Sequence, residues 1–443
     1  MSISTFNHAS YDPRRVASHP FKIPIYSFEA PFDKIKIIRI QDYNERYFHG
    51  VQINGTSYNS FVFEHSPGEW TVVDSCKDDF ADIYVASVKE IVGDLNKVTR
   101  IICHHSEWDH SSSIVHLYQL TPNATIVASP NCIVAMKRFF PALQHARWES
   151  WKNGLVTEFG DFRLTFVHTP LLHWSDSAVS KLDHLPSGKG LFFSMDIFGA
   201  HIAGEEVFMD EYKKEHGYSN WRSEASEYYA NTVSCYRLQT KQTLAKLPSF
   251  GAIDIIANAH GPIYRRSEDI VDVVKLYTSF ANNERTENKI TIYYDTNFNS
   301  TGISCEVVAA RLRARGMKVK LIRFSAFDKA FWGREAVDTE AFIFASATLN
   351  NSCQPYVAMG INYLGSLDLV KKMPCAILTH YGWNEKVCAK KMRTLLEMEG
   401  AQFPIDDCHI QWRADDTDIP RLEQFADNFA DAVIANRVSK MKI

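Results

Sequence analysis

The sequence lacks paired cysteines, and this absence excludes several kinds of site. Nine cysteines occur among its 443 residues, and no two of them form a CxxC pair. An odd number without such spacing argues against a disulfide framework, a zinc ribbon and a fused rubredoxin-like site built from four thiolates. We therefore expect most of the cysteines to be buried, reduced thiols in a cytosol-like compartment.

Long apolar runs and blocks of like charge are also absent. No stretch reaches the roughly 18 apolar residues that a membrane span needs, so we expect no contact with a membrane. The first residues, MSISTFNHASYDPRR, lack the apolar core of a secretory signal. Their Ser, Thr and Arg content leaves an organellar presequence as the alternative to a cytoplasmic location. The net charge is -4, and nothing indicates binding to nucleic acid.

The length of the chain predicts more than one domain. Hydrophobic residues make up 45% and charged residues 23%, which is typical of globular proteins with a substantial core. A chain of this length usually forms two or three domains. The polar segment 281–288 (ANNERTEN) resembles a linker. We therefore predict a first domain over residues 1–285, with an N-terminal extension over 1–28, and a second domain over 286–443.

The two predicted domains differ in their pattern of strands. The first contains short strand-like runs with helical patterns between several of them, which indicates an α/β or sandwich-like fold. These runs are 61–63, 70–74, 100–103, 124–128, 163–167, 191–194 and 254–256. In the second, strands at 290–294, 319–324, 341–345, 376–379 and 409–412 alternate with helical stretches such as 304–315 and 385–399. Regular alternation predicts a doubly wound parallel sheet of flavodoxin size.

A dense group of potential metal ligands follows one of these strands. In Ile101–His110 (IICHHSEWDH), an apolar run ends and His105, Glu107, Asp109 and His110 follow within six residues. A loop beyond a strand end can direct several side chains into one cleft. His104 is not included, because its neighbour His105 fits the spacing better.

Three further candidates occur in the same local context. His173, Asp196 and His260 each come shortly after an apolar, strand-like run and are followed by turn residues. Four imidazoles and three carboxylates could hold two cations, with one carboxylate between them. A nitrogen and oxygen set without thiolate suits iron or manganese, and it can also suit zinc.

A third pattern indicates a flavin. The first strand of the second domain ends in Tyr293–Gly302 (YYDTNFNSTG), a loop rich in hydroxyls and poor in glycine. Hydroxyls and backbone N–H groups at a helix N-terminus can hold a phosphate, and we select Thr296, Ser300 and Thr301 as its contacts. Such a loop fits a monophosphate such as FMN better than the GxGxxG loop that binds a pyrophosphate.

The H-x-E-x-D-H motif resembles that of the metallo-β-lactamase fold, whose zinc hydrolases have His where this chain has Glu107. That exchange resembles the flavodiiron proteins, here of the A-type without a fused rubredoxin module. The resemblance implies an αββα sandwich followed by a flavodoxin-like domain, and a homodimer with head-to-tail subunits or a dimer of such dimers. In the implied diiron centre one iron is held by His105, Glu107 and His173, the other by Asp109, His110 and His260, and Asp196 bridges them.

The resemblance also implies roles around the flavin. Two loops, Ala345–Asn351 and His380–Trp383, would flank the flavin ring. The implied contacts with FMN are Thr296, Asn297, Ser300, Thr301, Thr348, Leu349, Asn350, Tyr381, Gly382 and Trp383. Separately from the resemblance, His201, which follows Asp196 by five residues, could donate a hydrogen bond into the diatomic pocket. Tyr229, or its neighbour Tyr228, could do the same, and packing in the core of a helix is the alternative for each tyrosine. The chain departs from the family's usual pattern at Ala345–Thr348 and at Asn384–Lys386, both beside the expected flavin.

The implied function is reduction of dioxygen to water, of nitric oxide to nitrous oxide, or of both, with electrons delivered through FMN. The electron donor would be a separate partner, namely a rubredoxin-like protein, reduced deazaflavin or an NAD(P)H-linked reductase. Two alternatives are a zinc hydrolase with an accessory flavodoxin-like domain and an electron carrier whose first domain is only a scaffold. Glu107 argues against the first alternative, and the complete set of ligands argues against the second.

Overall fold

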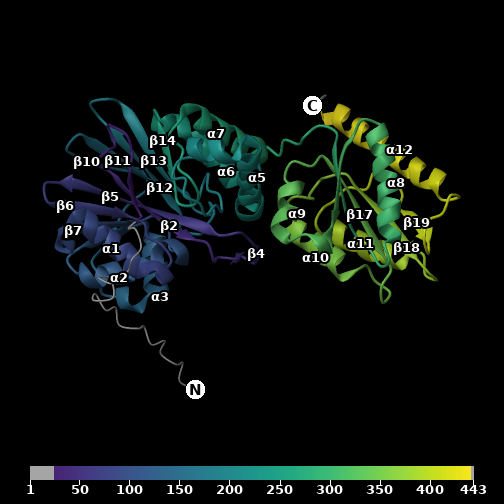
Figure 1. Ribbon diagram of the computed structural model, residues 1–443, viewed down its shortest axis with the longest axis horizontal. Coiled ribbons are helices and arrows are strands. Elements are labelled where there is room, and N and C mark those ends of the chain that lie inside the picture. Colours follow the sequence, from purple (N-terminus) through teal and green to yellow (C-terminus); the bar gives the residue numbers. More distant parts are fainter. Residues whose placement is uncertain (1–23, 441–443) are drawn as a thin grey trace, which may run out of the picture. The chain divides into compact units, whose positions relative to one another are not determined.

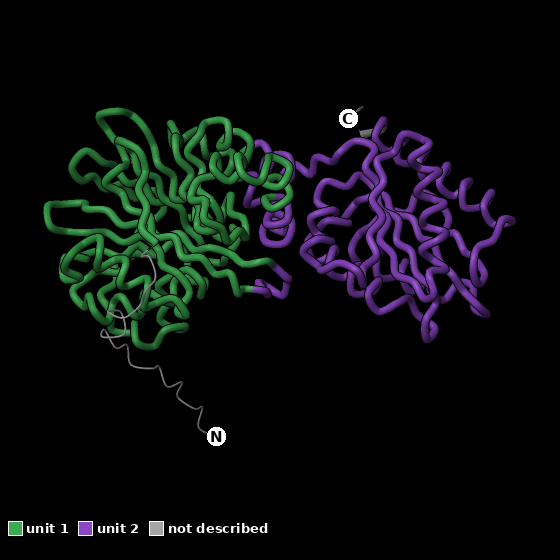
Figure 2. Tube along the Cα trace, in the orientation of Figure 1, with its two compact units in different colours: residues 1–45, 54–225, 242–274 green, residues 46–53, 226–241, 275–443 purple. Residues whose placement is uncertain are grey.

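The computed structural model describes residues 24–440, which form two compact units (Figures 1 and 2). Of the described residues, unit 1 contains 24–45, 54–225 and 242–274, and unit 2 contains 46–53, 226–241 and 275–440. Most of the predicted N-terminal extension lies outside the described residues, but 25–27 form a strand. The division of the chain at residue 285 stays a prediction. Within the described part of the chain, no helix is long and apolar enough to cross a membrane.

Unit 1 is built on two sheets. The seven-stranded sheet has the order β1-β2-β5-β6-β7-β8-β9, and the five-stranded sheet has the order β10-β11-β12-β13-β14. The strands of the first sheet are β1 Ile25–Ser27, β2 Lys36–Asp42, β5 Thr56–Ser66, β6 Glu69–Val73, β7 Val98–Cys103, β8 Thr125–Ala128 and β9 Trp148–Ser150. Those of the second are β10 Leu155–Phe159, β11 Phe162–His168, β12 Ala178–His184, β13 Lys189–Met195 and β14 Ile255–Asn258.

Alternation of side chains along these strands creates two cores. In β7, Ile102 packs between the two sheets, whereas Ile101 and Cys103 pack against the helices on the other face. Successive side chains of a strand point to opposite faces of the sheet. A strand that is covered on both faces therefore needs apolar residues at consecutive positions. Four helices lie wholly in unit 1, namely α1 Ala81–Val92, α2 Trp108–Leu120, α3 Pro130–Phe139 and α4 Met209–His216. Three further helices have residues in both units, namely α5 Tyr218–Tyr228, α6 Arg237–Lys246 and α7 Ser267–Ala281. The result is an αββα sandwich.

Unit 2 contains a parallel sheet of five strands in the order β16-β15-β17-β18-β19, the order of flavodoxin-like folds. The strands are β15 Lys289–Asp295, β16 Lys318–Arg323, β17 Ala341–Ala347, β18 Cys375–Tyr381 and β19 Cys408–Gln411. The helices are α8 Ser300–Ala314, α9 Lys329–Ala336, α10 Pro355–Ser366, α11 Val387–Met398 and α12 Ile419–Lys440. Helices α8 and α12 share a core with one face of the sheet. The short strands β3 (Tyr47–Phe48) and β4 (Val51–Gln52) also belong to unit 2.

The predicted strands of both domains are confirmed, whereas β1, β2, β3, β4, β9, β10 and β12 were not predicted. In β2 the sequence KIIRIQD places Arg39 at a fully buried position. In β12 the sequence AVSKLDH places Ser180 and Lys181 at buried positions. Buried polar side chains break the apolar pattern by which the other strands were found.

Helix α10 provides a test of packing in unit 2. A Cβ atom on Gly360 would lie 2.3 Å from Cε1 of Phe324, whose ring is fully buried. We therefore expect Gly360→Ala to lower the free energy of unfolding by about 1–3 kcal/mol through overpacking, despite the higher helix propensity of alanine. The measurement is urea unfolding of both proteins.

Gly365→Ala is the matched control, because it lies in the same helix. There the new Cβ would meet the side chain of Glu399, which can rotate away. The control should leave stability unchanged or raise it by up to about 1 kcal/mol. Equal losses in both variants would show that packing against Phe324 is not the cause.

Candidate metal centre

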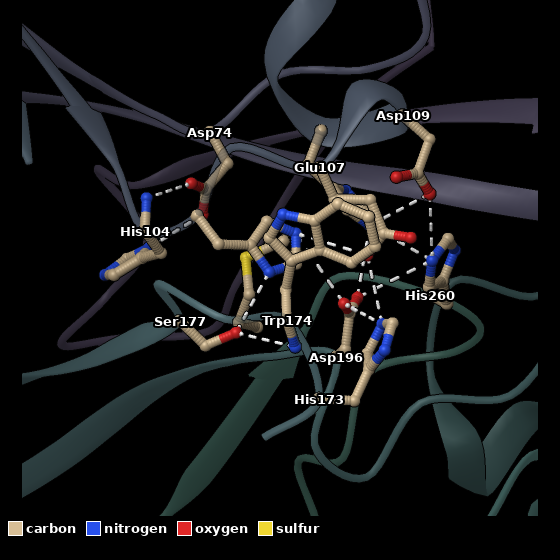
Figure 3. Close-up of polar contacts among 12 residues, drawn as sticks. Asp74, His104, Glu107, Asp109, His173, Trp174, Ser177, Asp196 and His260 are labelled. Atoms are coloured by element: carbon tan, nitrogen blue, oxygen red, sulfur yellow. Dashed lines mark hydrogen bonds and ion pairs between the residues drawn. The ribbon is translucent and has the colours of Figure 1, made fainter. Parts of the chain in front are cut away.

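The seven predicted ligands come from loops at the ends of strands in both sheets of unit 1. His105 and Glu107 follow β7, and Asp109 and His110 lie in the first turn of α2. The other three follow β11, β13 and β14. All seven are buried, with at most 7% of the residue surface exposed. Several of them are drawn together in Figure 3, where their polar atoms point toward a common centre.

Asp196 lies at the centre of this group, and its two oxygens face different neighbours (Figure 3). Oδ2 lies 3.1 Å from His173 Nε2 and 3.6 Å from His105 Nε2. Oδ1 lies 3.1 Å from His110 Nε2 and 3.6 Å from His260 Nε2. The carboxylate therefore separates two sets of ligands and could contact a cation on each side.

Each set is completed by another carboxylate. Glu107 Oε2 lies 3.0 Å from His173 Nε2 and 3.9 Å from His105 Nε2. Asp109 Oδ2 lies 3.2 Å from the Nε2 atoms of both His110 and His260. Two groups of two imidazoles and one carboxylate thus face Asp196. The ligand roles of these residues stay predictions.

The arrangement fits cations. His105 Nε2, both oxygens of Asp109 and both oxygens of Asp196 make no hydrogen bond to any residue that the structure describes. Buried polar atoms are rarely left in this state, because their desolvation is costly. Two subsets, His105–His110–Asp196 and Asp109–His110–His260, have ligand atoms within 4.8 Å of one another. A set of nitrogen and oxygen donors suits iron, manganese or zinc.

The charges around His110 and His173 also favour a cation at this place. Burial lowers the pKa of His110, but Asp109 and Asp196 outweigh it and raise this pKa to about 9. Burial also opposes the charge on His173, whose pKa nevertheless rises to about 10 beside Glu107 and Asp196. Protons on these imidazoles balance the carboxylates when no cation does so.

Other polar side chains fix the loops that carry the ligands. Ser106 donates from its backbone N–H to Asp176 Oδ2 at 2.9 Å, and Trp174 Nε1–H donates to Ser106 Oγ at 3.2 Å. The loops after β7 and β11 are thereby joined. Ser177 Oγ lies 3.3 Å from His105 Nδ1, a contact of the kind that orients metal-binding imidazoles. In the sequence these partners are marked only by their places beside His105 and His173.

His104 has a different role from its neighbour. Its Nδ1 lies 2.7 Å from Asp74 Oδ2, and its Nε2 lies 2.8 Å from Ser180 Oγ. Asp74 Oδ1 also accepts the backbone N–H of His104 at 2.8 Å. This fully buried histidine therefore ties β6, β7 and β12 together, and its ring does not join the ligand group (Figure 3).

The two predicted substrate contacts lie in different surroundings. His201 is half-buried, and the centroid of its ring is 5.1 Å from that of His260. Its Nδ1 lies 3.1 Å from Thr56 Oγ1. Tyr229 belongs to unit 2, where its buried ring packs against Tyr277 and Phe280. The catalytic roles of both stay predictions.

A cavity of about 660 Å³ lies at the carboxyl ends of the strands in unit 2. Eight predicted flavin contacts line it, namely Asn297, Ser300, Thr348, Leu349, Asn350, Tyr381, Gly382 and Trp383. The other two, Thr296 and Thr301, are buried and are not part of its lining. Trp412 and Arg413 also line the cavity, and they lie outside the three loops that were expected to hold the flavin.

The loop at the start of α8 fits a phosphate. The Thr301 N–H donates to Thr296 Oγ1 at 3.1 Å, and the buried Thr301 Oγ1 makes no hydrogen bond to any described residue. Phe298 and Asn299 have positive φ values of 52° and 60°, a conformation that is uncommon for residues other than glycine. The buried hydroxyl of Thr301, at the N-terminal end of the long helix α8, is suited to an anion.

The pKa values of the histidines predict how cation binding depends on pH. At neutral pH the metal-free protein should carry protons on His110 and His173, whose pKa values are about 9 and 10. Cations at the Nε2 atoms would displace these protons, so affinity should rise with pH up to about 10 and roughly two protons should be released per chain at pH 7. Calorimetric titration in buffers of different ionisation enthalpy counts the protons.

A titration above pH 10 is the control, because the release of protons should disappear there. If no protons were released at pH 7, the expectation would be wrong.

Comparisons with known proteins agree with both units. The family model described as "ODP family beta lactamase" matches residues 57–261. The chain is 28% identical over 411 residues to the rubredoxin-oxygen oxidoreductase of Megalodesulfovibrio gigas, covering 91% of this chain and 97% of that protein. It is 26% identical over 384 residues to the anaerobic nitric oxide reductase flavorubredoxin of Enterobacter sp. (strain 638), covering 85% of this chain and 76% of the relative.

Solved structures give the same result. Rubredoxin oxygen:oxidoreductase from Desulfovibrio gigas superimposes with a TM-score of 0.84 at 27% identity, covering 92% of this chain and 98% of that one. The flavodiiron protein from Giardia intestinalis has a TM-score of 0.85 over 94% of this chain and 98% of its own, and its 24% identity is evidence for the fold alone. With its αββα sandwich and its flavodoxin-like sheet, the chain is similar along almost its whole length to the rubredoxin-oxygen oxidoreductase and shares the fold of the flavodiiron proteins.

Proposed function

We propose that the protein is an oxidoreductase that reduces dioxygen to water, nitric oxide to nitrous oxide, or both. The observation that carries the proposal is the position of Asp196 between two sets of nitrogen and oxygen ligands. The relatives named above reduce oxygen or nitric oxide according to their names. Those names argue against the zinc hydrolase alternative.

The residues of the centre have separate tasks in this proposal. His105, Glu107 and His173 would hold one iron, and Asp109, His110 and His260 would hold the other, with Asp196 facing both sets of ligands. A diiron pair and FMN, when bound, would supply the electrons and the binding of a diatomic molecule. Burial of the ligands excludes bulk water, which strengthens their interaction with the cations.

Protons must reach the substrate together with the electrons. Reduction of dioxygen to two waters takes four electrons and four protons, and conversion of two nitric oxide molecules to nitrous oxide and water takes two of each. His201 is the candidate that we assign to this task, because it is half-buried beside His260 and its Nδ1 is held near Thr56. We propose Tyr229 as a second hydrogen-bond donor on the basis of the sequence alone.

Electrons would enter through FMN in the cavity of unit 2. We propose that Thr296, Ser300 and Thr301 hold its phosphate and that the loops at Thr348–Asn350 and Tyr381–Trp383 flank its ring. The external donor is proposed to be a rubredoxin-like protein, with reduced deazaflavin or an NAD(P)H-linked reductase as alternatives. A head-to-tail homodimer, or a dimer of dimers, would bring the FMN of one subunit to the irons of the other. The nine free cysteines support a reducing compartment such as the cytoplasm.

The composition and turnover of the purified protein test this function. We expect about two irons and one FMN per chain, and consumption of oxygen or nitric oxide by the reduced protein at an electrode. Asp196→Asn should lower the iron content and abolish consumption while FMN stays bound, because the variant changes only unit 1. Zinc in place of iron, with no oxygen consumed after reconstitution with iron, would overturn the proposal.

The buried hydroxyl of Thr301 tests the flavin site. Thr301→Val keeps the shape of the side chain but removes a hydroxyl that has no partner among the described residues. We expect affinity for FMN to fall at least about tenfold, since one hydrogen bond to a charged group contributes roughly 1.5–3 kcal/mol. The stability of the flavin-free protein should not decrease. Quenching of FMN fluorescence measures the affinity.

Thr291→Val is the control, and its expected effects on stability and on FMN affinity are the reverse of those of Thr301→Val. Thr291 Oγ1 lies 2.6 Å from Thr339 Oγ1, near the opposite end of β15 from the cavity. This variant should lower stability by about 1 kcal/mol and leave the affinity for FMN unchanged. If both variants weakened FMN binding equally, Thr301 would not be the phosphate contact.

A further inference from the structure

Arg39 on β2 is an arginine in the core of unit 1. Its side chain is fully buried. Nη1 donates to Asn59 Oδ1 at 3.0 Å and to the carbonyl oxygen of Gly261. Nε and Nη2 make no hydrogen bond to any residue that the structure describes. Burial lowers the pKa of Arg39 to about 10, so the guanidinium remains charged at neutral pH. Such a group is costly to bury, and its position requires a reason.

The reason lies in the loop that it contacts. Asn59 donates from its backbone N–H to the carbonyl of Ala259 at 2.8 Å. Its Nδ2 donates to the carbonyls of Asn258 at 2.8 Å and Gly261 at 2.9 Å. Arg39 and Asn59 together therefore hold three carbonyls of the short loop 258–261, which carries His260.

The same loop is fixed tightly on its other sides. Gly261 has a φ of +80°, and a Cβ there would lie 2.8 Å from the carbonyl oxygen of Ala200. The Gly261 N–H donates to Ser57 Oγ at 3.0 Å, and His260 Nδ1 lies 2.9 Å from the carbonyl oxygen of Ser57. The direction of the imidazole thus depends on the backbone of this loop.

The contacts of Arg39 reach only one half of the candidate centre. His260 Nε2 faces Asp109 Oδ2, whereas the loop with His105 and Glu107 is held by other groups, among them Asp176 through Ser106. We propose that Arg39 and Asn59 are positioning residues for the cation held by Asp109, His110 and His260, and that this cation depends on them while its neighbour does not. The inference rests on the proposed two-metal function.

Titration of the metal-free protein with Co²⁺ under anaerobic conditions tests this asymmetry. Wild type should bind two ions per chain. Arg39→Met and Asn59→Ala should keep one ion at wild-type affinity and bind the second at least tenfold more weakly. The absorption spectrum of their one-metal form should match that of His260→Ala and differ from that of His173→Ala. Arg39→Lys, which retains a charge and donors, should recover part of the affinity.

Lys181→Met is the matched control. Lys181 is also a nearly fully buried cation of unit 1, and it lies on β12 with Asp183 and the carbonyl of Phe250 as its partners. This variant should lose stability without any change in either metal. Parallel weakening of both ions in Arg39→Met, or no weakening of either, would overturn the proposal.

Hydrogen exchange separates this inference from the proposed function, because it requires no metal. In the metal-free protein, the amides of Ala259 and Gly261 should exchange at least tenfold faster in Arg39→Met than in wild type, while segment 103–107 remains unchanged. If wild type failed to bind two metals, the proposed function would fall, and the exchange rates would still decide whether Arg39 holds the loop. Unchanged exchange at both amides would show that it does not.

Discussion

The charge balance at Asp196 constrains the rest of unit 1. Three carboxylates and four imidazoles lie together in a buried place, and so many ionisable groups can share it only if their charges are balanced. The neighbouring imidazoles keep the pKa of Asp196 well below its usual range, although burial acts in the opposite direction. Four loops from two sheets must end at one point for this balance to exist. The αββα sandwich meets that requirement because strands of both sheets end at the same edge.

The local sequence contained much of this site. His105, Glu107, Asp109 and His110 could be found because their spacing is dense and because an apolar strand precedes them. The three distant candidates were found from the same context of strand and turn. Figure 3 shows that the structure gathers them in one place. In unit 2, alternation of strands and helices predicted the parallel sheet, and two strand-end loops predicted most of the cavity wall.

Several of the parts that were not predicted depend on contacts between residues far apart in the sequence. Strands β2 and β12 contain buried polar side chains, and no apolar alternation revealed them. Arg39 and Ser180 are buried because they bind groups far away in the sequence, the carbonyl of Gly261 and the ring of His104. Trp412 reaches the cavity only because β19 lies beside β18. Contacts of this kind depend on which strands are neighbours in the sheet, and that order cannot be derived from a single sequence.

The composition of unit 2 has a consequence for the order of folding. Residues 46–53 and 226–241 are grouped with the C-terminal segment, and β4 contacts α9. Asn231 donates to the carbonyl of Ala330 at 3.1 Å and accepts from the Tyr363 hydroxyl at 2.7 Å. During synthesis, segments 46–53 and 226–241 leave the ribosome before α9 and α10. They therefore cannot make these contacts until α9 and α10 have been synthesised. Closing such long loops slows folding, and a chain cut near residue 285 would leave the partners of Asn231 facing water on the excised fragment.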